Sequence, residues 1–251
     1  MLTSHRKHAI LAALKRDGQV IAKDLSEQFE VSEDTVRRDL RELAADGLLQ
    51  RVHGGALPAS PAVGTIEQRQ RISPNGKTAI ARKAASMVRP GQVVIIDGGT
   101  TCVQMARHLP LTLKATVVTH SPSVALELLD HPDIEVILIG GRLFKHSVVA
   151  VGAAAIEAIG HIRADTCFMG VTGIHPSAGL STGDMEEAYV KRALMARAAD
   201  VVVLASAEKI NAASPFVIAE ATAVSTIVVD TDTTGNSLAA FVALGIGIVR
   251  A

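Results

Sequence analysis

Three arginines lie close together in one short stretch of the chain, at Arg37, Arg38 and Arg41. A guanidinium group can donate two hydrogen bonds to one guanine in the major groove of DNA. In a helix, Arg38 lies three residues from both Arg41 and Thr35, so these side chains share one side. Apolar residues point inward, at Val36, Leu40 and Leu43. The pattern predicts a helix that rests on a core and presents guanidinium groups to DNA.

The same arginines could instead form a solvated helix face. Asp34, Asp39 and Glu42 lie on the same predicted helix and are placed to pair with the arginines. Spacing alone does not decide between the two interpretations.

A second set of residues is suited to binding phosphate. It is the run Asp97-Gly98-Gly99-Thr100-Thr101, which follows a predicted apolar strand at 93–96. Glycine lets backbone N–H groups approach an anion, the start of the next helix attracts negative charge, and the threonines add hydroxyl donors. The run is not a P-loop, because no Gly-Lys-Ser or Gly-Lys-Thr follows it. A simple turn between a strand and a helix is the alternative.

Further polar and glycine residues follow other predicted strands or lie on adjoining helices. They are Thr119, His120, Gly140, Gly141, Arg142, Gly170, Lys191 and Lys209. In an open parallel sheet, ligands bind at the carboxyl ends of the strands. We expect these residues to line one crevice with donors suited to a sugar phosphate. The alternative for each residue alone is a structural turn or a solvated lysine.

The first part of the chain predicts the elements that position the arginines. Ile10, Leu11 and Leu14 share one face of a first helix, which Gly18 is placed to end. A second helix covers 21–29, and a third covers 33–46, with Ser32 as its N-cap and Gly47 as its stop. A strand-like stretch at 48–52 precedes the tight turn at 54–55. These elements predict a winged helix-turn-helix, whose third helix enters the major groove.

Basic residues outside the third helix could add contacts to the DNA backbone. Arg51 and His53 lie on the predicted wing, where they could meet phosphate or the minor groove. The basic cluster at 5–8, His5, Arg6, Lys7 and His8, could touch the backbone, because Lys and Arg gain affinity there by releasing counterions. The predicted DNA-binding residues are Ser32, Thr35, Arg37, Arg38, Arg41, Arg51, His53 and Lys7.

Beyond Lys77, apolar strands alternate with helices. The predicted strands are 93–96, 116–119, 135–139, 166–171, 201–205 and 227–229, and the predicted helices are 77–88, 101–109, 122–130, 149–160, 184–199 and 236–244. This alternation predicts an α/β domain with a mainly parallel, Rossmann-like sheet. Residues 57–65 are rich in Pro, Ala and Ser, as linkers are. We therefore expect a winged helix-turn-helix at 1–57, a linker at 58–76, and an α/β effector-binding and oligomerisation domain at 77–251.

The composition narrows the class of protein. The 251 residues carry 25 basic and 25 acidic side chains, and this zero net charge first argues against DNA binding. Residues 1–56 hold nine side chains of each sign, so the basic groups there are locally arranged without being in excess. Aromatic residues make up 2%, which disfavours single-stranded nucleic-acid binding by base stacking. The two cysteines exclude a disulfide scaffold and disfavour a zinc site. We expect no signal peptide, membrane span, metal or cofactor, and a cytoplasmic location.

Two runs in the N-terminal part resemble the DeoR family of bacterial repressors. Val31-Ser-Glu-Asp-Thr-Val-Arg-Arg-Asp-Leu40 closely resembles the family's helix-turn-helix signature. The following Leu43-x-x-x-Gly47-x-x-x-Arg51-x-His53-Gly54-Gly55-Ala56 is also similar to that family. The resemblance implies that the third helix is a recognition helix.

The second half resembles the sensor domain of the same family, which is similar to ribose-5-phosphate isomerase. The matching runs are Asp97-Gly-Gly-Thr-Thr101, Ile139-Gly-Gly-Arg142, Ala164-Asp165-x-Cys-Phe-Met-Gly170 and Glu187-x-x-x-Lys191-Arg192. The resemblance therefore covers nearly the whole chain, with two departures. His120 stands where the family usually has Asn, and Ser206 stands where it usually has Asp, in a run that keeps Lys209.

The resemblance implies a repressor of a carbohydrate-metabolism operon. It would bind double-stranded operator DNA as a homodimer or homotetramer, and a phosphorylated sugar held by the loop 97–101 would release it. His120 could add a phosphate contact, or it could fill space and donate one hydrogen bond. The alternative function is a sugar-phosphate isomerase with an appended DNA module, whose base would be Asp97, Asp165 or Glu187. A nicotinamide-dependent enzyme is disfavoured, because no Gly-x-Gly-x-x-Gly follows a strand.

Overall fold

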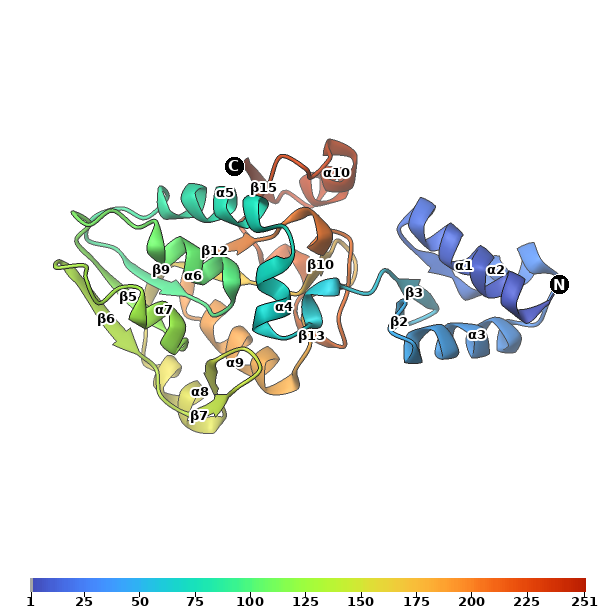
Figure 1. Cartoon of the computed structure of the whole chain (residues 1–251), viewed down its shortest axis with the longest axis horizontal. Coiled ribbons are helices and arrows are strands. Elements are labelled where there is room, and N and C mark those ends of the chain that lie inside the picture. Colours follow the sequence, from blue (N-terminus) through green and yellow to red (C-terminus); the bar gives the residue numbers. More distant parts are fainter. Residues whose placement is uncertain (1) are drawn as a thin grey trace.

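The computed structural model describes residues 2–251, which form two parts joined by one stretch of chain (Figure 1). The N-terminal part lies at one end of the molecule and contains three helices and a small antiparallel sheet. Its helices are α1 (Thr3–Asp17), α2 (Ala22–Phe29) and α3 (Glu33–Ala45). Its strands are β1 (Val20–Ile21), β2 (Gln50–Val52) and β3 (Gly55–Leu57), in the order β1-β3-β2. The winged helix-turn-helix predicted from the sequence is confirmed.

Local sequence explains where these helices begin and end. Gly18 follows α1 with a φ of 74°, a left-handed conformation that glycine adopts without strain. The Ser32 hydroxyl accepts a hydrogen bond from the Thr35 N–H at 3.2 Å, so Ser32 is the N-cap of α3 as expected. Val36, Leu40 and Leu43 of α3 are buried against α1 and α2, where Ile10, Leu14 and Leu25 are also buried. The polar face of α3 is therefore turned away from this core.

The C-terminal part is built on a parallel sheet. Within the described residues the sheet has seven strands, in the order β15-β14-β12-β9-β4-β5-β6. Every pairing in it is parallel. The strands are β4 (Val93–Ile96), β5 (Ala115–Thr119), β6 (Ile134–Leu138), β9 (Ala164–Gly170), β12 (Ala198–Leu204), β14 (Thr226–Val229) and β15 (Gly247–Arg250). The predicted α/β class with a mainly parallel, Rossmann-like sheet is confirmed, and β15 is a strand that the sequence patterns did not predict.

Helices cover both faces of the parallel sheet. They are α5 (Pro74–Ala85), α6 (Thr100–Arg107), α7 (Pro122–Leu126), α8 (Ala153–Gly160), α9 (Met185–Met195) and α10 (Gly235–Ala243). The short helix α4 (Ile66–Arg71) lies against α6. Short 3₁₀ turns lie at η1 (Pro61–Val63), η2 (Ala207–Lys209) and η3 (Ala221–Ala223). None of the helices in residues 2–251 combines the length and apolar character that a membrane crossing requires.

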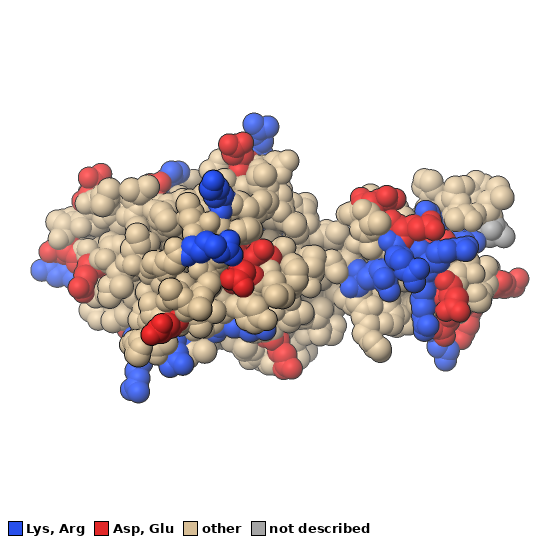
Figure 2. All heavy atoms as spheres, turned by 90° about the horizontal axis from the view of Figure 1, so that it is seen from below, with Lys and Arg blue, Asp and Glu red and all other residues tan. Residues whose placement is uncertain are grey.

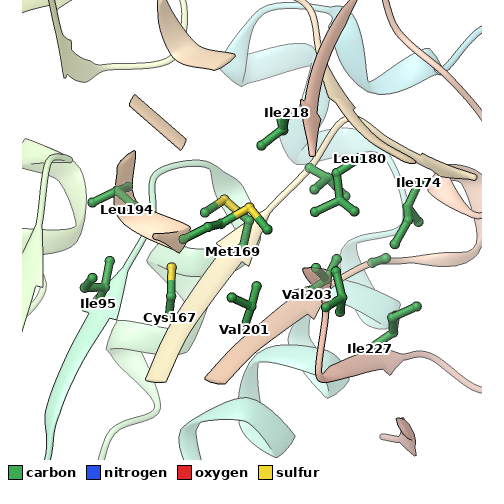
Figure 3. Packing of buried hydrophobic residues seen from close by; sticks show 14 of the residues in the cluster. Ile95, Cys167, Met169, Ile174, Leu180, Leu194, Val201, Val203, Ile218 and Ile227 are labelled. Carbon is green, nitrogen blue, oxygen red and sulfur yellow. The ribbon is translucent and has the colours of Figure 1, made fainter. Parts of the chain in front are cut away.

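Alternate side chains of each central strand pack into different cores. In β9, Cys167 and Met169 face the core that contains α8 and α9 (Figure 3). Phe168 faces the core that contains α5 and α6. In β4, Ile95 belongs to the first core, and its neighbours Val94 and Ile96 belong to the second. Because both faces are covered, the strands are continuously apolar, which is the pattern that identified them in the sequence.

Two small antiparallel elements were not predicted. The hairpin β7 (Arg142–Phe144) and β8 (Val149–Val151) occupies the start of the predicted helix 149–160, so that helix begins at Ala153. A second sheet joins β10 (Gly173–His175), β11 (Gly179–Thr182) and β13 (Phe216–Ala219). Both correct the sequence interpretation, because short strands with few residues leave no clear alternation.

The stretch expected to be a linker, 58–76, is packed against the α/β part. It contains η1 and α4, and it leads into α5, which starts at Pro74. The Ser60 N–H donates to the Ala213 carbonyl at 3.2 Å, and the Ala213 N–H donates to the Pro58 carbonyl at 3.1 Å. Its composition is that of a linker, but its backbone is hydrogen-bonded to the C-terminal part.

Candidate DNA interface and ligand pocket

The exposed face of α3 carries the arginines that the sequence pattern singled out. The side chains of Arg37, Arg38 and Arg41 are exposed. In the described part of the chain, Arg38 and Arg41 form no ion pair, whereas Arg37 is 2.6 Å from Glu33 and 3.8 Å from Asp34. Figure 2 shows basic side chains gathered on one face of the N-terminal part, with acidic side chains beside them. The interpretation as a solvated, internally paired face therefore fits Arg37 better than Arg38 and Arg41.

Ser32 and Thr35 lie at the start of the same helix. The Ser32 hydroxyl is 3.0 Å from the Thr35 hydroxyl and also caps the helix. Ser32 is exposed, and Thr35 is half-buried. Because both lie at the N-terminus of α3, they could contact a phosphate group there, where the helix dipole also attracts anions.

Arg6 is not on the DNA-facing surface, which corrects the expectation for the basic cluster at 5–8. Its side chain is 4% exposed, and its Nη2 donates to Asp39 Oδ1 at 3.1 Å. Its Nε also donates to Asp39, which is fully buried within α3. Asp39 therefore pairs with α1 and not with the arginines of its own helix. Lys7, half-buried, lies 2.7 Å from Glu42.

The wing carries the two other predicted DNA contacts. Arg51 lies in β2, and His53 lies in the turn between β2 and β3; both side chains are exposed. Arg51 is directly opposite Ala56 across the hairpin. The hairpin leaves both side chains free to reach a phosphate or a groove edge.

A pocket lies where the chain order reverses in the parallel sheet. β4 and β9 are neighbours at the centre, and the chain moves outward from them in opposite directions. Ligands of open α/β sheets bind in the crevice at such a switch point. The pocket residues are Ala62, Arg69, Lys77, Gly98, Gly99, Thr100, Thr101, Gly170, Val171, Thr172, Thr182, Glu187, Lys191 and Lys209. The loop after β4 and the loop after β9 thus both contribute to one site.

Seven of the predicted effector residues line this pocket. They are Gly98, Gly99, Thr100, Thr101, Gly170, Lys191 and Lys209. Gly99 precedes α6 with a φ of 98°, which L-amino acids rarely adopt, so a glycine is needed to turn the strand into the helix. The first N–H groups of α6 have no partner within the helix and point towards its N-terminal end, where the pocket lies.

Asp97 lies beneath the pocket in a buried polar network. Its Oδ1 is 2.8 Å from His120 Nε2, and its Oδ2 accepts from the Gly170 N–H at 2.9 Å and from Lys191 Nζ. Burial acts to raise the pKa of Asp97, but the charge of Lys191 and the hydrogen bond from His120 outweigh it and hold that pKa well below its ordinary value. Asp97 is therefore an anion that fixes the loops after β4 and β9.

Lys191 is the main counter-charge of this network. Burial acts to lower the pKa of its ammonium, but the charges of Asp97 and Glu187 raise that pKa above its ordinary value. Its Nζ also donates to the Gly170 carbonyl at 2.9 Å. Lys191 thus borders the pocket while most of its charge is neutralised by Asp97.

His120 is fully buried and is outside the pocket. Its Nδ1 is 2.9 Å from the Ala150 carbonyl, and its Nε2 faces Asp97. Both ring nitrogens therefore face oxygen atoms of neighbouring segments. The proposed phosphate contact by His120 is not seen; the residue positions the buried carboxylate. The alternative was that His120 fills space and donates one hydrogen bond. Its position is closer to that alternative, except that the ring has two polar contacts and not one.

Four further predicted residues also lie outside the pocket. Thr119 is fully buried, and its hydroxyl accepts from the Ser121 N–H at 3.1 Å. Gly140, Gly141 and Arg142 are exposed after β6, and Arg142 lies 3.8 Å from Glu186. β6 is the outermost strand, so its end is too far from the central crevice. A position after a strand was therefore not sufficient to place a residue in the pocket.

Two of the three carboxylates considered for isomerase chemistry are poorly placed as bases. Asp97 is held by Lys191 and His120. Asp165 lies at the amino end of β9, where it accepts from the Val93 N–H at 2.8 Å. The pocket lies at the carboxyl ends of the strands, so Asp165 is at the other end of β9. Glu187 does line the pocket.

Two cationic residues of the pocket were missed by sequence reasoning. Arg69 comes from α4, inside the stretch 58–76 that was expected to be a linker, and Lys77 comes from α5, directly after it. With Lys209 they make the pocket cationic. Burial lowers the pKa of Lys209 to about 8, and the nearby charge of Lys77 acts in the same direction. The capping pattern Thr65-x-x-Gln68 is a sequence signal that could have revealed α4.

Two polar atoms at the pocket are buried without a partner among the described residues. They are Thr101 Oγ1 and Arg69 Nε. Thr101 is 3% exposed and begins α6. Unpartnered buried polar groups are rare in folded proteins, because each costs free energy. Groups of three or more potential metal ligands are absent from residues 2–251.

The fold and the two sites define a class: a helix-turn-helix DNA-binding domain followed by an α/β ligand-sensing domain. Residues 6–61 match the DeoR-like helix-turn-helix domain, and residues 72–231 match the DeoR C-terminal sensor domain. The chain belongs to the DeoR family of transcriptional repressors. It is therefore a DNA-binding regulator and not an enzyme, and the isomerase alternative is set aside.

Individual proteins show the same likeness. The HTH-type transcriptional regulator GlpR of Haloferax volcanii is 36% identical over 84% of this chain and 83% of its own. The glycerol-3-phosphate regulon repressor of Escherichia coli K12 is 33% identical over 83% of each chain. Among solved structures, ribose 5-phosphate isomerase A of Methanocaldococcus jannaschii is 16% identical, over 53% of this chain and 52% of that one, with a TM-score of 0.39.

Proposed function

We propose that this repressor controls a carbohydrate-metabolism operon and that a phosphorylated sugar or polyol in the pocket at the switch point releases it from DNA. A related repressor is named for the glycerol-3-phosphate regulon, which supports a phosphorylated effector. The phosphate would lie at the N-terminus of α6, against the loop 97–101. Lys209 and Arg69 would supply positive charge, and Lys191 with Asp97 would hold the floor of the site.

The observation that carries this proposal is the unpartnered Thr101 hydroxyl. It is buried beside a cationic pocket, in the first turn of a helix whose first N–H groups have no partner within the helix. A phosphate oxygen would satisfy these donors together, as anions do at helix N-termini. A neutral ligand would leave the charges of Lys209, Lys77 and Arg69 only partly balanced, by Glu187 and Glu208.

On the DNA side, we propose that Arg38 and Arg41 reach base edges, since both are exposed and unpaired in the described part of the chain. Ser32, Thr35, Arg37, Arg51, His53 and Lys7 would contact the phosphate backbone or support those that do. Two copies of the chain would place two α3 helices on half-sites about 34 Å apart. We place the DNA-binding domain at 1–57 and the sensor domain at 77–251, in a cytoplasmic protein.

Effector and DNA would be linked through a difference in affinity. A ligand shifts the equilibrium only if it binds the DNA-free form more tightly than the DNA-bound form, and such coupling is typically about 1–3 kcal/mol. The expected effect is a loss of DNA affinity of about five- to 150-fold when the pocket is saturated.

A ligand-binding measurement tests the proposal. The purified chain is titrated calorimetrically with a panel of phosphorylated sugars and polyols and with their unphosphorylated counterparts. We expect binding only within the phosphorylated set, and Thr101→Val should weaken it about tenfold or more, because a hydrogen bond to a charged group is worth about 1.5–3 kcal/mol. Thr112→Val, at an exposed position away from the pocket, is the matched control. Equal affinity for an unphosphorylated sugar would contradict the proposal.

A further inference from the structure

Residues 58–77, here named the strap, run from the wing to the pocket. The strap begins directly after β3, the wing strand that ends at Leu57, and it finishes in the first turn of α5. Three of its residues, Ala62, Arg69 and Lys77, form one wall of the pocket. The rest of the lining comes from the N-terminal end of α6, the loop after β9, β11, α9 and η2. The pocket is therefore closed on one side by the segment that connects it to the DNA-binding domain.

The strap is attached to the pocket loop at its wing end. Ser60 is 6% exposed, and its hydroxyl donates to the carbonyl of Thr172, itself a pocket residue. Ala59 forms a β-bridge with Ala213. Between the end of β3 and this attachment only two residues intervene, so little slack separates the wing from the pocket wall.

Arg69 is the strap residue with unused binding capacity. Its Nη2 donates to the Ser147 hydroxyl at 3.1 Å and to the His146 carbonyl at 3.3 Å, but its Nε is buried and unpartnered in residues 2–251. Burial lowers the pKa of Arg69, and the charges of Glu187 and Asp97 only partly oppose this. A guanidinium group has five N–H donors and no acceptor, so an anion is the group that satisfies it.

Lys77 is tied to the same turn of the strap. Its side chain is 3% exposed, and its Nζ donates to the carbonyl of Arg69. Burial lowers its pKa as well. A negative charge in the pocket would therefore interact with both cations. Lys77 also fixes the backbone of α4 at Arg69 through this hydrogen bond.

We propose that Arg69 is an effector-binding residue supplied by the strap, so that a bound phosphate group joins the strap to the N-terminus of α6 and thereby transmits occupancy of the pocket to the wing. The inference rests on the proposed function, since it concerns the same site and ligand class. It adds the route: the anion fixes the strap at Arg69, Ser60 fixes it at Thr172, and the wing strand follows within a few residues. The connecting segment is then part of the sensor and not a passive tether.

The test uses the full chain with inorganic phosphate and glycerol 3-phosphate as probes. Affinity is measured by calorimetry, and amide hydrogen exchange is followed across 58–73 with and without saturating probe. We expect Arg69→Gln to weaken binding at least tenfold and to abolish probe-induced protection of the strap. Arg71→Gln, an exposed arginine on the same short helix, is the matched control and should change neither quantity. Arg69→Lys keeps the charge without the planar fork and should give an intermediate affinity.

The outcomes separate the two proposals. If neither probe nor any phosphorylated sugar binds the unaltered chain, the proposed function fails and the inference fails with it. If the unaltered chain binds and Thr101→Val does not, but Arg69→Gln binds within twofold of the unaltered chain, only the role of the strap is overturned. Protection confined to 97–101, with none in 58–73, would overturn it as well. Thermal melting of each variant shows that a loss of binding is not a loss of fold.

Discussion

Asp39 and Arg38 are neighbours in the chain, and the buried pair between Arg6 and Asp39 predicts that they act differently. We expect Asp39 to act in folding and Arg38 to act in DNA recognition. Replacing Asp39 by alanine leaves the Arg6 guanidinium buried without its carboxylate, in a site where the pair is 4% and 0% exposed. Removing one partner of a buried ion pair typically costs about 3–5 kcal/mol. A domain of this size has a total stability of about 3–9 kcal/mol, at about 0.05–0.15 kcal/mol per residue. The variant should therefore lose most of the stability of the N-terminal domain.

Amide hydrogen exchange over α1 and α3 measures this stability inside the full chain. A loss of about 3–5 kcal/mol corresponds to exchange faster by about 150-fold to several thousandfold, since 1.4 kcal/mol is a factor of ten. Exchange in the parallel sheet of the C-terminal domain should not change. Arg38→Ala is the matched comparison: it should lose DNA binding while exchange in α1 and α3 remains normal, because Arg38 is exposed.

A double variant separates the loss of a charge pair from the loss of packing. Arg6→Met with Asp39→Leu replaces both partners by apolar side chains, and such replacements of buried pairs are often neutral or stabilising. We expect most of the lost protection to return. If Asp39→Ala accelerates exchange less than about fivefold, which is about 1 kcal/mol, the pair does not hold α1 against α3 and the reasoning is refuted.

Three further predictions concern the two sites. Arg38→Ala should reduce discrimination between specific and non-specific DNA by about 1–3 kcal/mol, and Arg37→Ala by less because Glu33 and Asp34 already pair with it, as competition binding assays would show. Because the pKa of Lys209 is lowered to about 8, its ammonium is lost as pH rises through that value, so phosphate affinity should weaken between pH 7.5 and 9.5; a flat profile, or one unchanged in Lys209→Arg, would argue against its role. The pKa of Asp97 is lowered in the folded protein, so Asp97 contributes stability above its ordinary pKa of about 4 and loses this contribution as pH falls towards its pKa in the folded protein. Thermal unfolding should therefore show a steeper loss of stability in acid for the unaltered chain than for Asp97→Asn.

The sequence carried most of the fold because its patterns were local and long. Strand 93–96 coincides with β4, and the expected N-cap Ser32 makes the expected hydrogen bond. The strands β7, β8, β10, β11 and β13 lack this local signal, since each is only three or four residues long. β7–β8 and β10–β11 are short hairpins, and β13 pairs with β11 from a distant part of the chain. β8 in particular was read as the start of a helix, because an apolar run of a few residues fits either element.

The site was predictable where chemistry and topology agreed. The glycines, threonines and lysines expected from strand ends do line the pocket at the switch point, whereas Gly140, Gly141 and Arg142 lie outside it, because the sequence does not give the order of strands in the sheet. Arg69 and Lys77 were missed because the Pro- and Ala-rich stretch before them resembles a linker. The pairing of Asp39 with the arginines of its own helix was only an alternative, and the structure pairs Asp39 with Arg6 of α1; pairing along one helix is visible in a sequence, and pairing with another helix is not.

The most direct test of the account measures DNA release as the pocket fills. Duplex DNA selected by the protein itself from a random-sequence pool is labelled, and its fluorescence anisotropy is followed while phosphorylated sugars or their unphosphorylated counterparts are added. The account predicts that a phosphorylated sugar releases the DNA from the unaltered chain, and that Thr101→Val binds the same DNA but needs at least tenfold more of that sugar. Release by an unphosphorylated sugar at the same concentration, or an identical response in Thr101→Val, would contradict it.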